Sequence, residues 1–220
     1  MSDKMKMYIA GNLTDGQGQV DVINPANERF VGTVATAGMQ DAERALEAAR
    51  DAFASWSKSS ITQRQEWMHK LRDEVIANEE YLRDCIHHEM GKPWASTQED
   101  FDSLKNSLEF YANEIAHIHD TSIADRAGTH RHLLVYEPTG VALAFIAWNF
   151  PLLNLAFKIG PAMAAGCPII IRPSEATPMS AYAVGELCHK IGLPAGVVQI
   201  LCTDGYDVAD ALSASPIPSL

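Results

Sequence analysis

Three short polar segments in the second half of the chain each follow an apolar run of strand length. They contain an amide, a cation, a hydroxyl, a carboxylate and a glycine, namely Asn149, Arg172, Ser174, Glu175 and Gly205. An open parallel sheet binds its ligands where the carboxyl ends of its strands meet. If the three runs are neighbouring strands, these residues lie at one edge of the sheet. The spacing therefore predicts a rim that binds a polar ligand, without identifying that ligand.

Each of these residues also has a purely structural interpretation. Asn149 could cap a helix that begins at Pro151, and Ser174 or Glu175 could cap the next helix along the chain. Arg172 and Glu175 could form a surface ion pair, which contributes little to stability. The Gly-rich loops that bind dinucleotides or phosphates do not occur in the sequence. Spacing alone leaves both interpretations open.

The elements that would position this rim alternate regularly. Apolar runs predict buried strands at residues 141–146, 168–171 and 197–201. Helical segments are predicted between and after these strands, at residues 151–165, 180–191 and 208–212. This alternation with short links is typical of right-handed crossover units in a parallel sheet. No strand signal follows residue 212, so we expect one edge of this sheet to stay open.

The first half of the chain reads as short strands followed by a long helical region. Strand patterns lie at residues 8–10, 20–23 and 30–34. From about residue 40 to residue 118, apolar side chains recur every three or four positions. The cleanest stripe is Phe101, Leu104, Leu108, Tyr111, Ile115 and Ile118. Gly91 and Pro93 predict the end of one helix and the start of the next, and residues 129–136 predict another strand.

Composition argues against several classes of protein. A net charge of −11 opposes binding to nucleic acid or to an anionic membrane surface. The four cysteines, Cys85, Cys167, Cys188 and Cys202, are widely spaced, so we expect neither a disulfide scaffold nor a metal site. The first residues lack the apolar core of a signal peptide, and no apolar run reaches the length of a membrane span. We therefore expect a cytoplasmic protein.

One motif resembles that of a known family. Residues 145–153 read Phe-Ile-Ala-Trp-Asn-Phe-Pro-Leu-Leu, similar to the Pro-Trp-Asn-Phe-Pro signature of the NAD(P)-dependent aldehyde dehydrogenase superfamily. Further similar segments follow the family's order, at residues 23–26, 89–92, 136–141, 158–162, 170–178 and 192–198. The resemblance runs from about residue 8 to residue 220 and corresponds to the N-terminal part of a family chain. It implies an α/β fold with an incomplete parallel Rossmann-like sheet, flanking helices, and short N-terminal and oligomerisation strands.

The resemblance also implies roles for individual residues. Asn149 matches the amide that helps to form the family's oxyanion hole, and Lys158 matches a lysine discussed as part of a proton path. Positions that contact the cofactor in the family match Ile146, Ala147, Trp148, Arg172, Ser174, Glu175 and Gly205. Among these, Glu175 corresponds to the carboxylate that hydrogen-bonds the adenosine ribose. We predict NAD as the cofactor, with NADP as the alternative.

The chain departs from the family pattern at four positions of this rim. Ala147 stands where the family usually has proline, and Arg172 stands where it usually has lysine. Arginine is a planar fork and lysine a flexible point charge, so recognition of the ribose or of a 2′-phosphate differs between them. Thr203 and Ala209 occupy positions that are commonly glycine. These differences affect the expected adenosine contacts.

Aldehyde oxidation in the family needs two further groups. A cysteine thiolate attacks the carbonyl, and a glutamate activates the water that releases the product. In family chains both follow a Phe-Thr-Gly-Ser segment, and none of the four cysteines here matches the position of the nucleophile. We therefore expect the N-terminal portion of an aldehyde dehydrogenase that is inactive alone.

This interpretation divides the chain into two parts and suggests its partners. Residues 1–136 would form the N-terminal strands, the helical layer and the oligomerisation strand, and residues 137–220 the first half of the cofactor-binding sheet. Expected partners are further copies of the chain or a complementing C-terminal chain. The alternative is a self-standing, non-catalytic module that binds or oligomerises.

Overall fold

A computed structural model describes residues 4–220 as seven α-helices and eleven short strands. The helices are α1 (Met39–Trp56), α2 (Ile61–Ala77), α3 (Glu79–Met90), α4 (Thr97–Glu114), α5 (Pro151–Ala165), α6 (Met179–Lys190) and α7 (Asp207–Ala214). The strands are β1 (Lys4–Met5), β2 (Met7–Ile9), β3 (Asn12–Thr14), β4 (Gly18–Asn24), β5 (Arg29–Ala37), β6 (Thr121–Ala124), β7 (Arg131–Leu134), β8 (Ala142–Ile146), β9 (Ile169–Pro173), β10 (Val198–Ile200) and β11 (Cys202–Thr203).

The main sheet has the strand order β3-β2-β10-β9-β8. Strands β8, β9 and β10 are parallel, as the alternation of strands and helices predicts. Strand β2 pairs antiparallel with β10, and β3 pairs antiparallel with β2. The N-terminal strands therefore extend the predicted parallel sheet into a mixed one.

A second sheet is centred on β5, which pairs with β1, β4 and β11. The chain crosses from the main sheet to this one between β10 and β11, where Ile200 pairs with Tyr8 and Cys202 pairs with Thr36. At this crossing, the buried hydroxyl of Tyr182 on α6 forms hydrogen bonds with both β5 and β11. It donates to the Ala35 carbonyl at 2.6 Å and accepts from the Cys202 N–H at 2.9 Å. This bridge ties α6 to β5 and β11.

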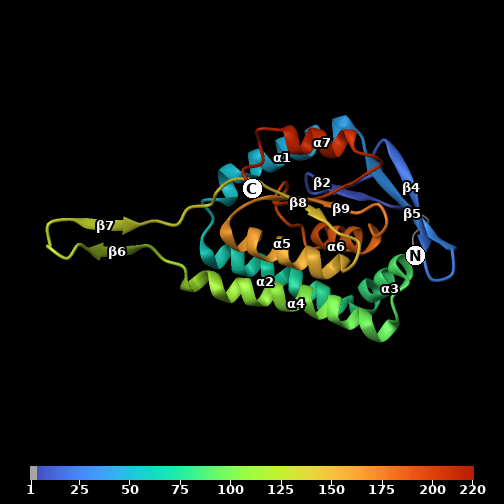
Figure 1. The fold of residues 1–220 in the computed structure, drawn as a ribbon, viewed down its shortest axis with the longest axis horizontal. Helices are drawn as coiled ribbons and strands as arrows, with labels where there is room; N and C mark the ends of the chain where they lie inside the picture. The colour runs from blue at the N-terminus through green and yellow to red at the C-terminus, as the bar shows by residue number, and fades with distance from the viewer. Residues whose placement is uncertain (1–3) are drawn as a thin grey trace.

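Helices cover both faces of the main sheet (Figure 1). Helix α1 contacts β2, β9 and β10, and α7 packs on α1. On the other face, α5 packs on β8 and β9 while α6 packs on β2 and β10. Helices α2 and α4 form a further layer against α5. This packing on both faces leaves β9 and β10 almost wholly buried, and their residues are mostly apolar.

The helical region from residue 39 onward follows the predicted stripes with two corrections. Phe101, Leu104 and Leu108 of α4 are buried as expected, but Ile118 is 44% exposed. Helix α3 ends at Gly91, whose positive φ of 67° provides the left-handed cap. Pro93 does not start the next helix, because a short 3₁₀ turn (Trp94–Ser96) follows it and α4 begins only at Thr97.

A long hairpin of β6 and β7 projects away from the rest of the molecule (Figure 1). The predicted strand at 129–136 is shorter in the structure, and its partner β6 was missed because its four residues carry no clear alternation. Both strands are exposed along their whole length. A two-stranded hairpin of this kind buries too little surface to be stable without further contacts.

The free edge of β8 is partly covered, contrary to the expectation of an open edge. Residues 217–220 run beside the start of β8: Val141 forms a parallel bridge with Pro218, and Leu143 donates to the Leu220 carbonyl at 3.0 Å. Proline-rich sequence hid this segment from strand patterns. Within residues 4–220, no helix is both long enough and apolar enough to cross a bilayer.

The Tyr182 bridge predicts a specific loss of stability. Replacing Tyr182 with Phe keeps the buried ring but leaves the Ala35 carbonyl and the Cys202 N–H unpaired in the core. We expect the free energy of unfolding to fall by about 2–4 kcal/mol, measured by urea denaturation. Tyr136→Phe, at a side chain that is 59% exposed, is the control and should change stability little. Equal stability of both variants would contradict the importance of this bridge.

Candidate functional site

The turn that follows β8 carries Asn149 and leads into α5. Its start is held by the carbonyl of Ile146, which accepts a hydrogen bond of 3.1 Å from the Ser174 N–H of the loop after β9. Helix α5 begins with Pro151 at its first position and Phe150 as its N-cap residue. Asn149 therefore does not cap α5, and the capping interpretation is wrong. Its side chain is exposed and available for other contacts.

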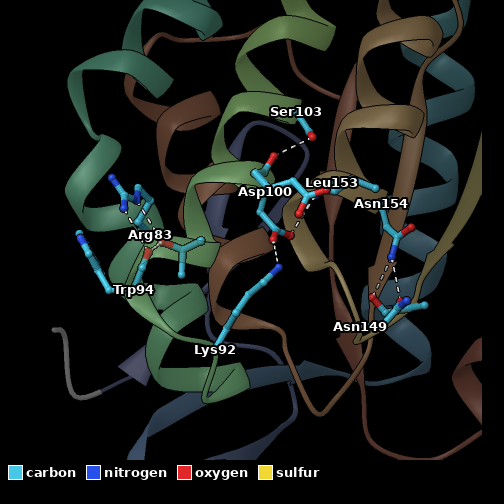
Figure 2. Close-up of polar contacts among 11 residues, drawn as sticks. Arg83, Lys92, Trp94, Asp100, Ser103, Asn149, Leu153 and Asn154 are labelled. Carbon is cyan, nitrogen blue, oxygen red and sulfur yellow. Dashed lines mark hydrogen bonds and ion pairs between the residues drawn. The ribbon is translucent and has the colours of Figure 1, made fainter.

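The side chain of Asn149 contacts Asn154 on the first turns of α5 (Figure 2). Asn154 Nδ2 donates to Asn149 Oδ1 at 3.3 Å and to the carbonyl oxygen of Ala147 at 3.4 Å. The backbone N–H of Asn154 donates to the Phe150 carbonyl at 2.9 Å, which closes the first turn of the helix. Two residues of the turn are thus bonded to the side chain of Asn154, and a third, Phe150, is bonded to its backbone.

A buried ion pair lies beneath the start of α5 (Figure 2). Asp100 of α4 is fully buried, and its Oδ2 lies 2.5 Å from Lys92 Nζ. Its other oxygen accepts from the Leu153 N–H at 3.4 Å. Lys92 Nζ also lies 4.1 Å from the centre of the Phe150 ring, a favourable cation–π position. The pair therefore holds the start of α5 at two points: Lys92 contacts Phe150, just before the helix, and Asp100 bonds Leu153 in its first turn.

The end of β9 carries the predicted cation, and the loop after β9 carries the predicted carboxylate. Arg172 Nη2 lies 2.9 Å from Glu175 Oε2, so the ion pair considered from the sequence does form. Arg172 Nε also donates to Thr203 Oγ1 at 3.0 Å, and that hydroxyl donates to the Gly205 carbonyl at 3.2 Å. Gly205 adopts a positive φ of 82°, which glycine tolerates without strain. These contacts join the ends of β9 and β11 into one rim.

Helix α6, which follows this loop, is capped from a distant part of the chain. Glu89 of α3 is buried and accepts from the backbone N–H groups of Met179 and Ser180, at 2.5 and 3.1 Å. Ser174 instead closes a local turn by accepting from the Ala176 N–H at 3.2 Å. Capping of α6 by Ser174 or Glu175 is therefore wrong. Burial raises the pKa of Glu89 to about 7, although the two N–H donors favour its ionised form.

A cleft of about 380 Å³ lies between this rim and α3. Its walls include Trp148, Glu175, Thr177 and Glu89. Trp148 and the carboxylate of Glu175 are more than half exposed. The hydroxyl of Thr177 is buried and has no hydrogen-bond partner among the described residues. An accessible carboxylate beside an exposed aromatic ring suits a ligand with both polar and apolar parts.

Trp148 and Glu175 line this cleft, and the other predicted residues are not among its lining residues. Ile146 is buried at the end of β8, and Ala147 is exposed and offers only its carbonyl to Asn154. Lys158, two turns along α5, is exposed and lines a separate groove of about 340 Å³ between β8 and α5. The structure thus gathers the predicted cofactor positions around one rim and places Lys158 on another surface.

The four cysteines are buried and unpaired. Burial raises the pKa of the Cys188 and Cys202 thiols to about 12 and also raises the pKa of Cys85 well above its usual value. A thiol of this kind is protonated at neutral pH and is a poor nucleophile. In the part of the chain that the structure describes, no three His, Cys, Asp or Glu side chains are grouped to hold a metal ion.

Sequence reasoning missed four residues that shape the site. Lys92 and Glu89 belong to a motif noted in the sequence, but the Phe150 ring and the N–H groups of α6 that they contact lie far along the chain. Asp100 and Asn154 look like ordinary polar residues of helices α4 and α5. The sequence offered one signal for Asp100: it lies at a buried position on the apolar stripe of α4. A charge at such a position requires a partner.

Comparison with known proteins identifies related chains. The sequence model described as the aldehyde dehydrogenase family matches residues 13–219. Mitochondrial succinate-semialdehyde dehydrogenase of Rattus norvegicus is 33% identical over 215 residues, which cover 96% of this chain and 41% of the rat protein.

Solved structures agree with this match. A 3,6-anhydro-L-galactose dehydrogenase in complex with NAP superposes with a TM-score of 0.89 and 28% identity, over 98% of this chain and 46% of that one. A point mutant of betaine aldehyde dehydrogenase from Staphylococcus aureus, in complex with NAD⁺, gives a TM-score of 0.90 and 30% identity, over 97% and 44%. The chain spans less than half the length of these relatives.

The buried ion pair predicts that Lys92 and Asp100 depend on each other. Lys92→Met leaves the Asp100 carboxylate buried without a cation, and we expect the free energy of unfolding to fall by about 3–5 kcal/mol. The double variant Lys92→Met/Asp100→Asn should regain much of this loss, because no charge is then buried alone. Urea denaturation measures both. Lys105→Met breaks a partly exposed pair with Asp102 and should cost about 1 kcal/mol or less. Additive losses in the double variant would contradict the coupling.

The raised pKa of Glu89 predicts a pH-dependent stability. Below pH 4.5 the carboxyl is protonated in both the folded and the unfolded chain and costs nothing. Between pH 4.5 and about pH 7, the unfolded chain ionises first, so the folded state loses up to ~3 kcal/mol relative to Glu89→Gln. Unfolding free energies of both proteins at pH 5 and pH 8 measure this difference. Glu47→Gln, on the exposed face of α1, is the control, and its free energy of unfolding should match that of the unmodified chain at both pH values.

Proposed function

The chain belongs to the aldehyde dehydrogenase family, and we propose that it supplies the cofactor cleft and the oxyanion-stabilising amide of an enzyme that oxidises an aldehyde to a carboxylic acid. The observation that carries this proposal is the rim itself. Loops from β8, β9 and β11 meet there, bonded to one another through Ile146, Ser174, Arg172 and Thr203. This is the position at which open α/β sheets bind their ligands.

The cleft beside the rim fits a nicotinamide dinucleotide. The Glu175 carboxylate can accept hydrogen bonds from ribose hydroxyls. The exposed Trp148 ring offers an apolar face at the same cleft. When bound, the nicotinamide ring accepts the hydride that leaves the substrate carbon. The protein's own contribution is to hold that ring and to exclude water around it.

We propose NAD as the cofactor in preference to NADP. Arg172 is engaged by Glu175 and by Thr203, so its charge is already compensated. The Glu175 carboxylate would also repel a 2′-phosphate placed beside it. Both contacts favour a free ribose hydroxyl at this position.

Asn149 is the residue that we propose to stabilise the oxyanion. Its amide is exposed at the end of β8, and negative charge develops on the substrate oxygen when a nucleophile attacks the carbonyl. A well-placed donor to such an oxygen lowers the barrier by about 2.7–4 kcal/mol. Lys158 lies on α5, the helix that follows the turn of Asn149. We propose that Lys158 takes part in proton transfer at the surface groove that it lines.

The nucleophile and the general base come from outside these 220 residues in this proposal. The four cysteines are buried, and three have thiols whose pKa is raised by burial, so none offers an accessible thiolate. A cysteine and a glutamate from another segment or another chain would complete the site. Without them we expect no oxidation of aldehydes.

Two surfaces suit the expected partners, which are a complementing chain and a second copy of this chain. The groove between β8 and α5 has an apolar lining that includes Leu143 and Phe157, and a complementing chain could add a strand along the part of β8 that residues 217–220 leave uncovered. The projecting hairpin exposes Ile123 and Leu133, which suits contact with a second copy of the chain. The hairpin also favours the alternative function of a non-catalytic oligomerisation module.

Cofactor binding tests the proposal. We expect NADH, titrated into the chain and followed by energy transfer from tryptophan, to bind more tightly than NADPH. Glu175→Gln should reduce the preference for NADH roughly tenfold or more, because like-charge repulsion of the 2′-phosphate costs more than 1.4 kcal/mol.

Glu66→Gln, which removes one exposed carboxylate from α2, is the matched control and should leave the preference unchanged. Absence of NADH binding, with the fold intact by circular dichroism, would overturn the enzyme proposal and favour the oligomerisation module. Production of NADH from short aldehydes by the chain alone would overturn the assignment of the nucleophile to another segment.

A further inference from the structure

We propose that Asn154 is a positioning residue that fixes the orientation of the Asn149 carboxamide and so turns its N–H donors toward the substrate. This inference rests on the proposed function of Asn149. An amide oxygen would repel the negative charge that develops on the substrate. The inference adds the residue that keeps the Asn149 oxygen turned away from that charge.

The argument begins at the carbonyl of Ala147, which can only accept hydrogen bonds. Asn154 lies 3.4 Å from this oxygen, so the atom that faces it must be the NH₂ group of Asn154. The same NH₂ group lies 3.3 Å from the side chain of Asn149. A donor faces Asn149 there, and so Asn149 must present its oxygen to Asn154. Figure 2 shows both contacts converging on one nitrogen of Asn154.

The consequence concerns the other end of the Asn149 amide. With Oδ1 engaged, the NH₂ group of Asn149 points away from α5, with its two N–H donors uncommitted to Asn154. Exposed asparagine amides otherwise turn over readily, since both ends find partners in water. The backbone of Asn154 is held by the first helical hydrogen bond to Phe150. Its side chain therefore provides a fixed reference for the orientation of Asn149.

Two variants of Asn154 separate orientation from simple loss of a contact. Asn154→Asp replaces the donor with a carboxylate, which accepts only, so the Asn149 amide should reverse and turn its NH₂ group inward. Asn154→Leu removes the hydrogen bond without imposing the opposite orientation. Asn106→Asp adds the same charge to the exposed face of α4 and serves as the matched control.

The measurement is the pair of side-chain NH₂ signals of Asn149 in the ¹⁵N-labelled full chain, assigned by their loss in Asn149→Ala. In the unmodified chain these protons should exchange with water as fast as those of a free amide, while those of Asn154 are protected. In Asn154→Asp, exchange of the Asn149 protons should slow by roughly tenfold, since they then donate to a charged oxygen. In Asn154→Leu they should remain fast, and Asn106→Asp should change nothing.

Two results would overturn the inference: protected Asn149 protons in the unmodified chain, or Asn149 signals that do not respond to Asn154→Asp. The NADH titration described above tests the proposed function independently. If NADH does not bind but the Asn149 amide reverses in Asn154→Asp, the proposed function is refuted and the positioning contact stands. Clear NADH binding with an unresponsive amide would refute only the role of Asn154.

Discussion

The buried carboxylate of Asp100 is the constraint on which the geometry of the site depends. A charge with no solvent exposure needs a partner, and Lys92 provides it at 2.5 Å. Because Asp100 also accepts from the Leu153 N–H, the pair fixes where α5 begins. The turn that carries Asn149 ends at that point. An electrostatic requirement inside the helical layer thus determines the position of an exposed amide.

The same short segment of the helical layer holds both loops of the rim. Glu89 caps α6 after the second loop, and Lys92 supports α5 after the first. Gly91 lies between them with a positive φ, and a Cβ atom there would lie 2.9 Å from Ala26. Glycine therefore allows the chain to turn sharply, so that two charges only three residues apart support two different helices. This explains physically why residues 89–92 form a motif, of which Glu89 and Met90 also line the cleft.

Local patterns predicted most of the fold and part of the site. Apolar runs located β8, β9 and β10 because their burial on both faces is visible in composition alone. The antiparallel addition of β2 and the tail beside β8 were not visible, because three or four residues carry too little pattern. For Asn149, spacing left a cap and a site equally open. The position of Phe150 as the N-cap residue excludes the cap, and the role of Asn149 in a site stays a proposal.

The cap on α6 has a consequence for how an anionic cofactor can bind. In common dinucleotide folds the pyrophosphate lies on the N-terminus of a helix, approached through a Gly-rich loop. Here the Glu89 carboxylate already accepts from the N–H groups of Met179 and Ser180, so that anion site is filled by the protein itself. A second anion at the same N–H groups would be repelled whenever Glu89 is ionised. If the cleft binds the cofactor as proposed, recognition then depends on the ribose and the rings, through Glu175 and Trp148, which agrees with the absence of the Gly-rich fingerprint from the sequence.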